Sequence, residues 1–288
     1  MTKNSDTIKV IECPRDAMQG WHHFIPTDKK IEYISNLLKV GFDTIDFGSF
    51  VSPMAIPQMA DTKDVINNIE LGNTSTKLLA IIANLRGATE AVEFDKITYL
   101  GFPFSISETF QQRNTNSSVD ESLKRVEDIQ NLCVQHNKEL VVYISMGFGN
   151  PYGDEYNEEI VIKRTKQIEE LGVKIISIAD TVGLATANNV SDLLKKILPV
   201  FKNIEMGVHL HSAPENRIDT LKAALNAGCR RFDSALKGIG GCPMAGNDLV
   251  GNMDTETMLR YFEESGEQLH IDNIALQKCN KMASEIFI

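Results

Sequence analysis

Two histidines stand two positions apart in the apolar segment VHLHSAPEN. If this segment is a strand, His209 and His211 project from the same face, at a spacing that one divalent cation can bridge. The alternative is that two partly exposed imidazoles form ordinary hydrogen bonds near the end of a strand. The apolar neighbours Met206, Val208 and Leu210 indicate a buried strand, and two buried imidazoles need polar partners. The pair is therefore a candidate metal-binding element.

A charged pair follows the first apolar run, in the segment ECPRDAMQ. A carboxylate from Asp16 would complete a His-His-Asp set of nitrogen and oxygen ligands with open positions, a pattern that suits Mg, Mn, Fe or Zn. Arg15 and Asp16 could equally form a surface ion pair, or Asp16 could be the acid at a helix N-terminus. His22 and His23 follow closely, and we interpret them as solvated loop residues.

The segment GIGGCPMAGNDLVGN, residues 238–252, combines five glycines with a thiol. Such a density of glycine permits close backbone approach and a hinged loop. Glycine-rich loops alone are weak evidence. If the segment lies beside the histidine pair, however, the Cys242 thiol and the Asn252 amide make it a candidate lid over a reactive site.

Alternating segments along the whole chain indicate what positions these residues. Short β-branched runs predict strands at 8–12, 44–48, 77–83, 96–102, 139–146, 174–179, 205–211 and 230–236. Amphipathic segments predict helices at 28–40, 62–70, 86–94, 119–136, 155–171, 187–201, 213–227 and 254–264. Eightfold alternation predicts a parallel sheet closed into a (β/α)8 TIM barrel. An open doubly wound sheet is the alternative, but no GxGxxG follows the first strand.

Helix start and stop signals refine this prediction. Ser118 to Glu121 and Ser212 to Glu215 both have the capping-box pattern, and Gly172 and Gly228 stand where helices should end. No linker or low-complexity tract interrupts the chain, so we expect one TIM-barrel domain over 1–288. Its barrel should occupy about 8–265, with an extra C-terminal helical segment at 270–288. The Arg-Asp and HxH elements would then share the mouth at the C-terminal strand ends.

Composition excludes several classes of function. Of 288 residues, 42% are apolar and 24% charged, as in ordinary globular proteins. The net charge of -10 argues against a nucleic-acid or anionic-membrane partner. Five cysteines, an odd number without CxxC pairing, predict no disulfide framework and a reducing compartment. The first residues lack the apolar stretch of a signal peptide, and no apolar run is long enough to span a bilayer, so we expect a cytoplasmic protein.

Five segments, PRDAMQ, SFVSPMAIPQM, ADTVG, HLH and GIGGCPMAGNDLVGN, together resemble the hydroxymethylglutaryl-CoA lyases, which are metal-dependent TIM-barrel lyases. The resemblance runs in order from residue 10 to about residue 265. The Arg-Asp and HxH elements are shared with the isopropylmalate and homocitrate synthases. The SFVSP and GGCP elements are specific to the lyases.

The resemblance implies a function and roles for individual residues. The family cleaves hydroxymethylglutaryl-CoA to acetyl-CoA and acetoacetate, so the implied partner is an acyl-CoA substrate, and we expect a homodimer. The implied ligands of a divalent cation, Mg²⁺ or Mn²⁺, are Asp16, His209, His211 and Asn252. The implied catalytic groups are Arg15 at the enolate oxygen, Cys242 as proton donor or shuttle, Asp46, and Asp180 near the substrate. The implied substrate-binding residues are Gln19 and Lys237.

Departures from the family pattern concern the mouth of the barrel. Asp46 replaces a usual Glu, Ser212 and its successors replace Asp-Thr-Tyr-Gly, and Lys237 replaces a usually small residue. Lys237 could bind an anionic substrate or be a solvated lysine at a strand end. These changes leave the acyl group open. They also leave two alternatives: a condensing enzyme joining acetyl-CoA to a 2-oxo acid, and a non-catalytic barrel that binds metal and acyl-CoA.

Overall fold

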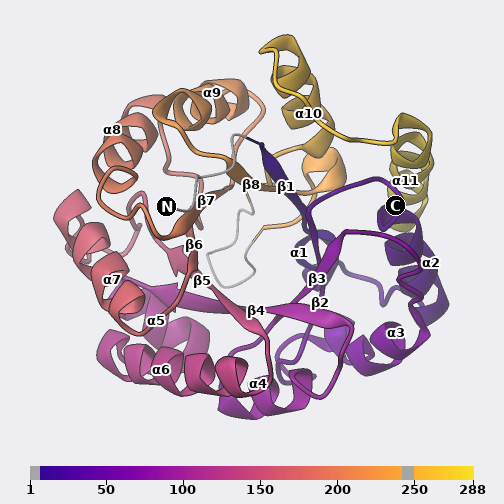
Figure 1. Cartoon of the computed structure of the whole chain (residues 1–288), viewed down its shortest axis with the longest axis horizontal. Helices are drawn as coiled ribbons and strands as arrows, with labels where there is room; N and C mark the ends of the chain where they lie inside the picture. Colours follow the sequence, from indigo (N-terminus) through magenta and orange to yellow (C-terminus); the bar gives the residue numbers. More distant parts are fainter. Residues whose placement is uncertain (1–6, 242–249) are drawn as a thin grey trace.

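The computed structural model of the protein describes residues 7–241 and 250–288. Within them, parallel strands in chain order form a closed barrel, because β8 pairs with β1 (Figure 1). The strands are β1 (Lys9–Glu12), β2 (Thr44–Ser49), β3 (Lys77–Ile81), β4 (Ile97–Ser105), β5 (Glu139–Ser145), β6 (Ile175–Asp180), β7 (Glu205–Leu210) and β8 (Arg231–Ser234). The predicted (β/α)8 TIM barrel is confirmed.

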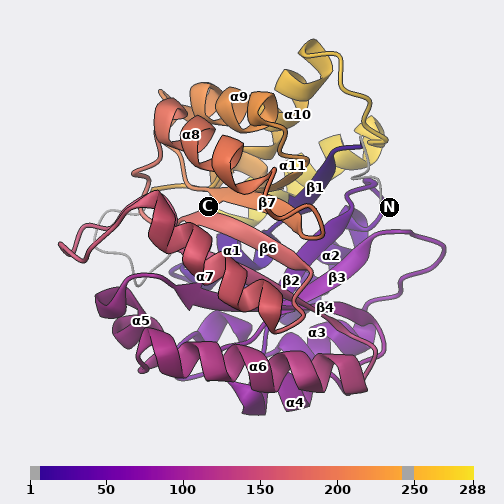
Figure 2. The same cartoon turned by 60° about the vertical axis from the view of Figure 1, so that its left-hand side comes forward.

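Helices form an outer layer around the barrel (Figures 1 and 2). They are α1 (Pro14–Gln19), α2 (Thr27–Leu37), α3 (Thr62–Asn68), α4 (Leu85–Ala91), α5 (Glu108–Thr115), α6 (Val119–Gln135), α7 (Glu158–Glu170), α8 (Ala187–Ile197), α9 (Arg217–Ala227), α10 (Thr255–Glu264) and α11 (Asn273–Ile286), with 3-10 turns η1 (Pro57–Met59) and η2 (Leu236–Gly238). None of these described helices has the length and apolar character that crossing a membrane requires.

Two apolar layers explain why these strands contain nearly continuous hydrophobic runs. The larger core lies between strands and helices and includes Phe102 and Phe232. A smaller cluster, which includes Leu79, Val141 and Tyr143, comes from alternate positions of the same strands. Strands of a parallel barrel are covered on both faces, so polar residues are costly along most of their length. Polar side chains inside the barrel therefore need a specific explanation.

The ends of several elements follow the sequence signals. The Ser118 capping box starts α6, and Gly172 and Gly228 adopt positive φ at helix ends, as predicted. The predicted capping box at Ser212 is wrong. Ser212 donates its N–H to Gly251 at 2.9 Å, and α9 begins only at Arg217. The backbone pairing at Ser212 keeps the chain out of the helix for one more turn.

Two short helices were not predicted from the sequence. Helix α5 precedes α6, and α1 begins directly after β1, with Pro14 at its first turn. Proline suits this position because its missing N–H has no intrahelical partner to lose. Arg15 and Asp16 therefore lie on the first turn of a helix at the barrel mouth, instead of on the strand itself.

Glu12 of β1 is a fully buried carboxyl that joins the barrel to its C-terminal segments. It accepts hydrogen bonds from the Leu236 N–H at 2.8 Å and from the Thr255 hydroxyl at 2.6 Å. Burial raises the pKa of Glu12 from 4.5 to about 8, although these hydrogen bonds oppose the shift. At neutral pH the folded protein therefore holds a proton that the unfolded chain has released.

This proton predicts how stability depends on pH. Between about pH 4.5 and about pH 8 the folded state binds more protons, so Glu12 makes the free energy of unfolding fall as pH rises. We expect Glu12→Gln, which cannot titrate, to lose less stability than wild type between about pH 5 and about pH 9. Urea unfolding at both pH values measures this. Glu263→Gln, at an exposed site on α10, is the matched control, and equal slopes in wild type and Glu12→Gln would contradict the prediction.

Candidate active site

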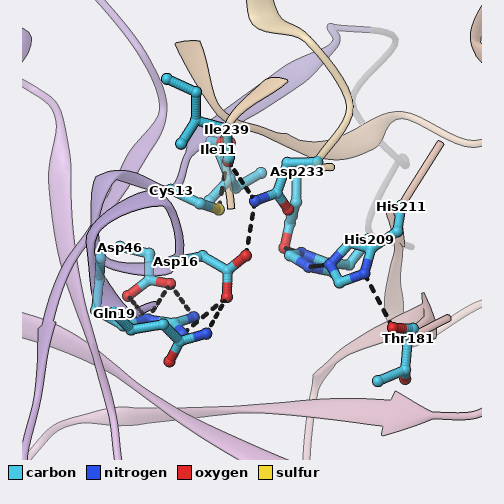
Figure 3. A network of polar contacts seen from close by, with 12 residues as sticks. Ile11, Cys13, Asp16, Gln19, Asp46, Thr181, His209, His211, Asp233 and Ile239 are labelled. Carbon is cyan, nitrogen blue, oxygen red and sulfur yellow. Dashed lines mark hydrogen bonds and ion pairs between the residues drawn. The ribbon is translucent and has the colours of Figure 1, made fainter. Parts of the chain in front are cut away.

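A cavity of about 890 Å³ opens at the C-terminal ends of the strands. Its inner end contains most of the polar residues that the sequence singled out, brought together from both ends of the chain (Figure 3). The predicted site residues that line it are Arg15, Asp16, Gln19, Asp46, His209 and His211.

Three of these residues are arranged as metal ligands. One potential ligand atom from each of Asp16, His209 and His211 lies within 4.8 Å of the others. The two Nε2 atoms face each other at 3.1 Å, while His211 Nδ1 lies 3.0 Å from the carbonyl oxygen of Thr181. Because a carbonyl only accepts, that Nδ1 carries the proton and the Nε2 of His211 is a bare acceptor.

The partner of His209 completes this pattern. His209 Nδ1 lies 3.1 Å from the carboxylate of Asp233, which is buried on β8 (Figure 3). A carboxylate that orients the far nitrogen of an imidazole is the usual arrangement behind a metal-bound histidine. With both Nδ1 atoms donating, two Nε2 lone pairs point at one another beside Asp16. A divalent cation between them satisfies all three groups, so the residues fit a metal ion.

Asp16 is held as an anion. Its Oδ1 accepts from Arg15 at 2.9 Å and from Gln19 at 2.7 Å, and its Oδ2 accepts from Asn252 at 2.6 Å. Burial alone would raise its pKa, but Arg15, the two imidazoles and Asn252 outweigh burial and hold the pKa of Asp16 well below its usual range. An ionised carboxylate is the form that binds a cation.

His211 is held in its neutral form. Burial, together with the neighbouring His209, lowers the pKa of His211 to about 4. At neutral pH the imidazole is therefore available as a ligand. Asn252 lies alongside, because its backbone forms an isolated β-bridge with His211. The Asn252 side chain donates to Asp16 and, at 2.9 Å, to the carbonyl of Ile239, which leaves its Oδ1 as the atom for a ligand role.

Arg15 forms a fork with Asp46 beneath the cavity. Its Nε lies 3.2 and 3.0 Å from the two carboxylate oxygens, and its Nη2 lies 2.5 Å from Oδ2. Burial raises the pKa of Asp46 to about 6, although Arg15 opposes the shift. Despite its own burial, Arg15 is held fully charged by Asp46 and Asp16. The result is a fixed guanidinium beside the candidate metal position.

Three predicted site residues do not join this group. The Asp180 carboxylate accepts the N–H groups of Leu184 and Ala185, both at 2.9 Å, and so shapes the loop after β6. The Lys237 ammonium pairs with Glu256 at 3.2 Å. Neither lines the cavity. Cys242 lies outside the described residues, so its role stays a prediction.

Other residues were missed. Asp233 stands in the predicted strand RRFDSAL, and a lone carboxylate between strand apolar residues was a signal that it needed a buried partner. The outer wall of the cavity contains the cations Arg86, Arg113 and Arg125. Arg113 stacks over Tyr152 at 4.6 Å, and Arg125 donates to the Thr115 carbonyl at 3.0 Å. This basic rim stands out in a chain of net charge -10.

Comparison with known proteins agrees with this arrangement. The HMGL-like family model matches residues 9–284. A cytoplasmic 3-hydroxy-3-methylglutaryl-CoA lyase of Danio rerio is 31% identical over 268 residues, 92% of this chain and 78% of that protein. The hydroxymethylglutaryl-CoA lyase of Bacillus subtilis is 32% identical over 258 residues, 90% of this chain and 85% of that protein. An HMG-CoA lyase structure from Acinetobacter baumannii, in complex with coenzyme A and 3-methylmalate, aligns with a TM-score of 0.91 and 32% identity, covering 100% of this chain and 93% of that one. The chain belongs to the HMGL-like family.

Proposed function

We propose that the protein is a divalent-metal-dependent carbon-carbon lyase. Its substrate is hydroxymethylglutaryl-CoA or a close branched 3-hydroxyacyl-CoA, and its products are acetyl-CoA and a ketone fragment, acetoacetate for the first substrate. The observation that carries this proposal is the meeting of Asp16, His209 and His211 beside the Arg15 guanidinium. The relatives named above as hydroxymethylglutaryl-CoA lyases support it.

Asp16, His209 and His211, with Asn252 Oδ1, would hold the cation, Mg²⁺ or Mn²⁺. When bound, such an ion polarises the substrate oxygens and lowers the cost of removing the alcohol proton. Arg15 serves the other fragment. As the carbon-carbon bond breaks, negative charge collects on the thioester oxygen, and a guanidinium already fixed by Asp46 stabilises it without having to reorganise.

The thioester fragment then needs a proton. We assign this step to Cys242, which follows Gly240 by two residues. The tight packing of Gly240 supports the assignment, because an added Cβ there would collide with the Asn252 side chain and the Asp16 backbone. The chain leading to Cys242 thus starts against the candidate metal ligands. A thiol delivered there on a closing loop would act with water excluded.

The basic rim suits the other end of an acyl-CoA. Coenzyme A carries its phosphates far from the thioester, and the Acinetobacter baumannii relative binds coenzyme A. Arg86, Arg113 and Arg125 line the same cavity as Arg15, and arginine makes charge-assisted contacts with phosphate. We propose that this rim binds the phosphates while the acyl group reaches the candidate metal position.

Loss of one rim arginine should weaken substrate binding without changing the chemistry. We expect Arg113→Gln to raise KM for the acyl-CoA about tenfold, the effect of one lost charge-assisted hydrogen bond. The value of kcat should stay unchanged, because Arg113 does not approach the reacting atoms. Steady-state kinetics with the CoA thioester and with the phosphate-poor pantetheine thioester separate the two effects. An equal rise in KM for both substrates would contradict phosphate binding by Arg113.

A panel of 3-hydroxy-3-methylacyl-CoA thioesters, assayed with Mg²⁺ or Mn²⁺ and again with chelator, tests the proposed function. Metal-dependent release of acetoacetate or another ketone is expected, and none from any thioester would overturn it. Thiol release from acetyl-CoA with a 2-oxo acid would instead favour a condensing enzyme. Cys242→Ser distinguishes the binding protein: the lyase should lose turnover but keep metal and ligand binding, whereas a binder shows turnover in neither form.

A further inference from the structure

A second set of potential ligands lies behind the first and shares one histidine with it. Cys13, His209 and Asp233 place one potential ligand atom each within 4.8 Å of one another. They come from three neighbouring strands: Asp233 pairs in register with His209, and the Cys13 N–H donates to Ser234 at 2.8 Å. Figure 3 shows Cys13, Asp233 and His209 around the inner end of the barrel mouth.

Both new members of this set have unused capacity to bind a ligand. Asp233 is 3% exposed, and its Oδ1 has no hydrogen-bond partner among the described residues. Buried carboxylate oxygens are normally partnered, so an orphan oxygen is a signal of a missing ligand. The fully buried Cys13 thiol makes only a weak contact, 3.8 Å from the Ile11 carbonyl. Thiol and carboxylate thus converge on the Nδ1 side of His209.

The charges around this position favour a cation. The carboxylates of Asp16, Asp46 and Asp233 act on Cys13, and Arg15 opposes them. Arg231 is coupled to Asp233 from the far side. Three anions against two cations leave one excess negative charge inside the barrel. Burial and these carboxylates raise the pKa of Cys13 well above its usual value, so the thiol becomes a thiolate only when an incoming cation compensates the charge.

We propose that Cys13, His209 and Asp233 form a second, inhibitory site for a thiophilic divalent cation such as Zn²⁺ or Cd²⁺. Sulfur, imidazole nitrogen and carboxylate oxygen together are a zinc-type ligand set, whereas Mg²⁺ and Mn²⁺ prefer oxygen-rich sets. The ion enters from the cavity past His209, whose side chain is 12% exposed and lines that cavity.

The shared histidine makes the two sites mutually exclusive. When the ion binds Nδ1, the Nδ1 proton moves to Nε2, and the Cys13 thiol proton leaves to solvent, so each ion bound releases one proton. His209 then presents an N–H to Asp16 and His211, and only two of the three candidate ligands remain for Mg²⁺ or Mn²⁺. The site itself does not depend on the reaction, but inhibition by it rests on the proposed function.

Cadmium titration of the metal-free full-length protein tests the site. Cd²⁺ bound to a thiolate has an ultraviolet sulfur-to-metal charge-transfer band, and we expect it to saturate in wild type. Cys13→Ser should weaken this binding at least about tenfold, because serine keeps the contact to Ile11 but offers no thiolate. Cys133→Ser, at another fully buried cysteine, and Cys242→Ser should keep the band. No band in wild type, or an equal band in Cys13→Ser, would overturn the proposal.

Two further measurements work without turnover and without a folded Cys13 variant. X-ray absorption of the Cd²⁺-loaded wild type and Cys242→Ser proteins should show one sulfur ligand in both, and a spectrum without sulfur would overturn the site. Paramagnetic resonance of free Mn²⁺ should show its affinity falling at least about tenfold when Cd²⁺ binds wild type. An unchanged Mn²⁺ affinity overturns the exclusion. Because no assay here uses a thioester, failure of the lyase proposal would be seen separately.

Discussion

Replacing His211 with asparagine should lower the affinity of the protein for Mn²⁺ by at least about 100-fold, the upper end of the loss caused by removing an outer partner of a ligand. His211 contributes one of the three ligand atoms that converge, and it is only 4% exposed. The shorter side chain cannot both keep the bond to Thr181 and reach the position of Nε2. Paramagnetic resonance of free Mn²⁺, measured during titration, reports this affinity directly.

Turnover should fall with the metal affinity and recover only partly at high Mn²⁺, because the remaining ligands orient the ion less well. His22→Asn is the matched control, since His22 is an exposed histidine near the barrel mouth and should leave Mn²⁺ affinity unchanged. A His211→Asn protein that binds Mn²⁺ as wild type does would show that the two imidazoles face each other for another reason.

Local sequence patterns were sufficient to predict the barrel and the convergence of Asp16 with the histidine pair. The HxH spacing determines that both imidazoles share a strand face, and strand-helix alternation determines that strand ends meet at one mouth. Both inferences depend only on neighbours in the chain. They needed no knowledge of how the remaining side chains pack.

Residues whose roles depend on distant contacts could not be placed in this way. Asp180 follows Ala179 by one position, and the alternation of a strand turns its carboxylate away from the cavity toward the next loop. Lys237 reaches Glu256 because the backbone has a positive φ of 65° there. Asp233 gains its role only from a register pair with His209. Which face and which register each residue takes is decided by the closed barrel.

Replacing Arg15 with glutamine should lower kcat/KM about 10²- to 10³-fold, the usual cost of removing one preorganised contact to developing negative charge. Glutamine cannot form the fork with Asp46 or carry charge to the thioester oxygen. Steady-state kinetics at saturating Mn²⁺ measure the loss, since Arg15 also contacts Asp16 at 2.9 Å and unsaturated metal would add a second effect. Arg15→Lys keeps the charge but not the fork, so it should recover only part of the rate.

The same substitution should also destabilise the fold, and the two effects can be separated. Without Arg15 the buried Asp46 loses its partner, and breaking a buried ion pair costs about 3–5 kcal/mol. Adding Asp46→Asn removes the orphaned charge, so the double variant should regain most of the free energy of unfolding while kcat/KM stays low. If activity returned together with stability, Arg15 would be a structural partner of Asp46, and the charge on the thioester oxygen would have to be stabilised by another group.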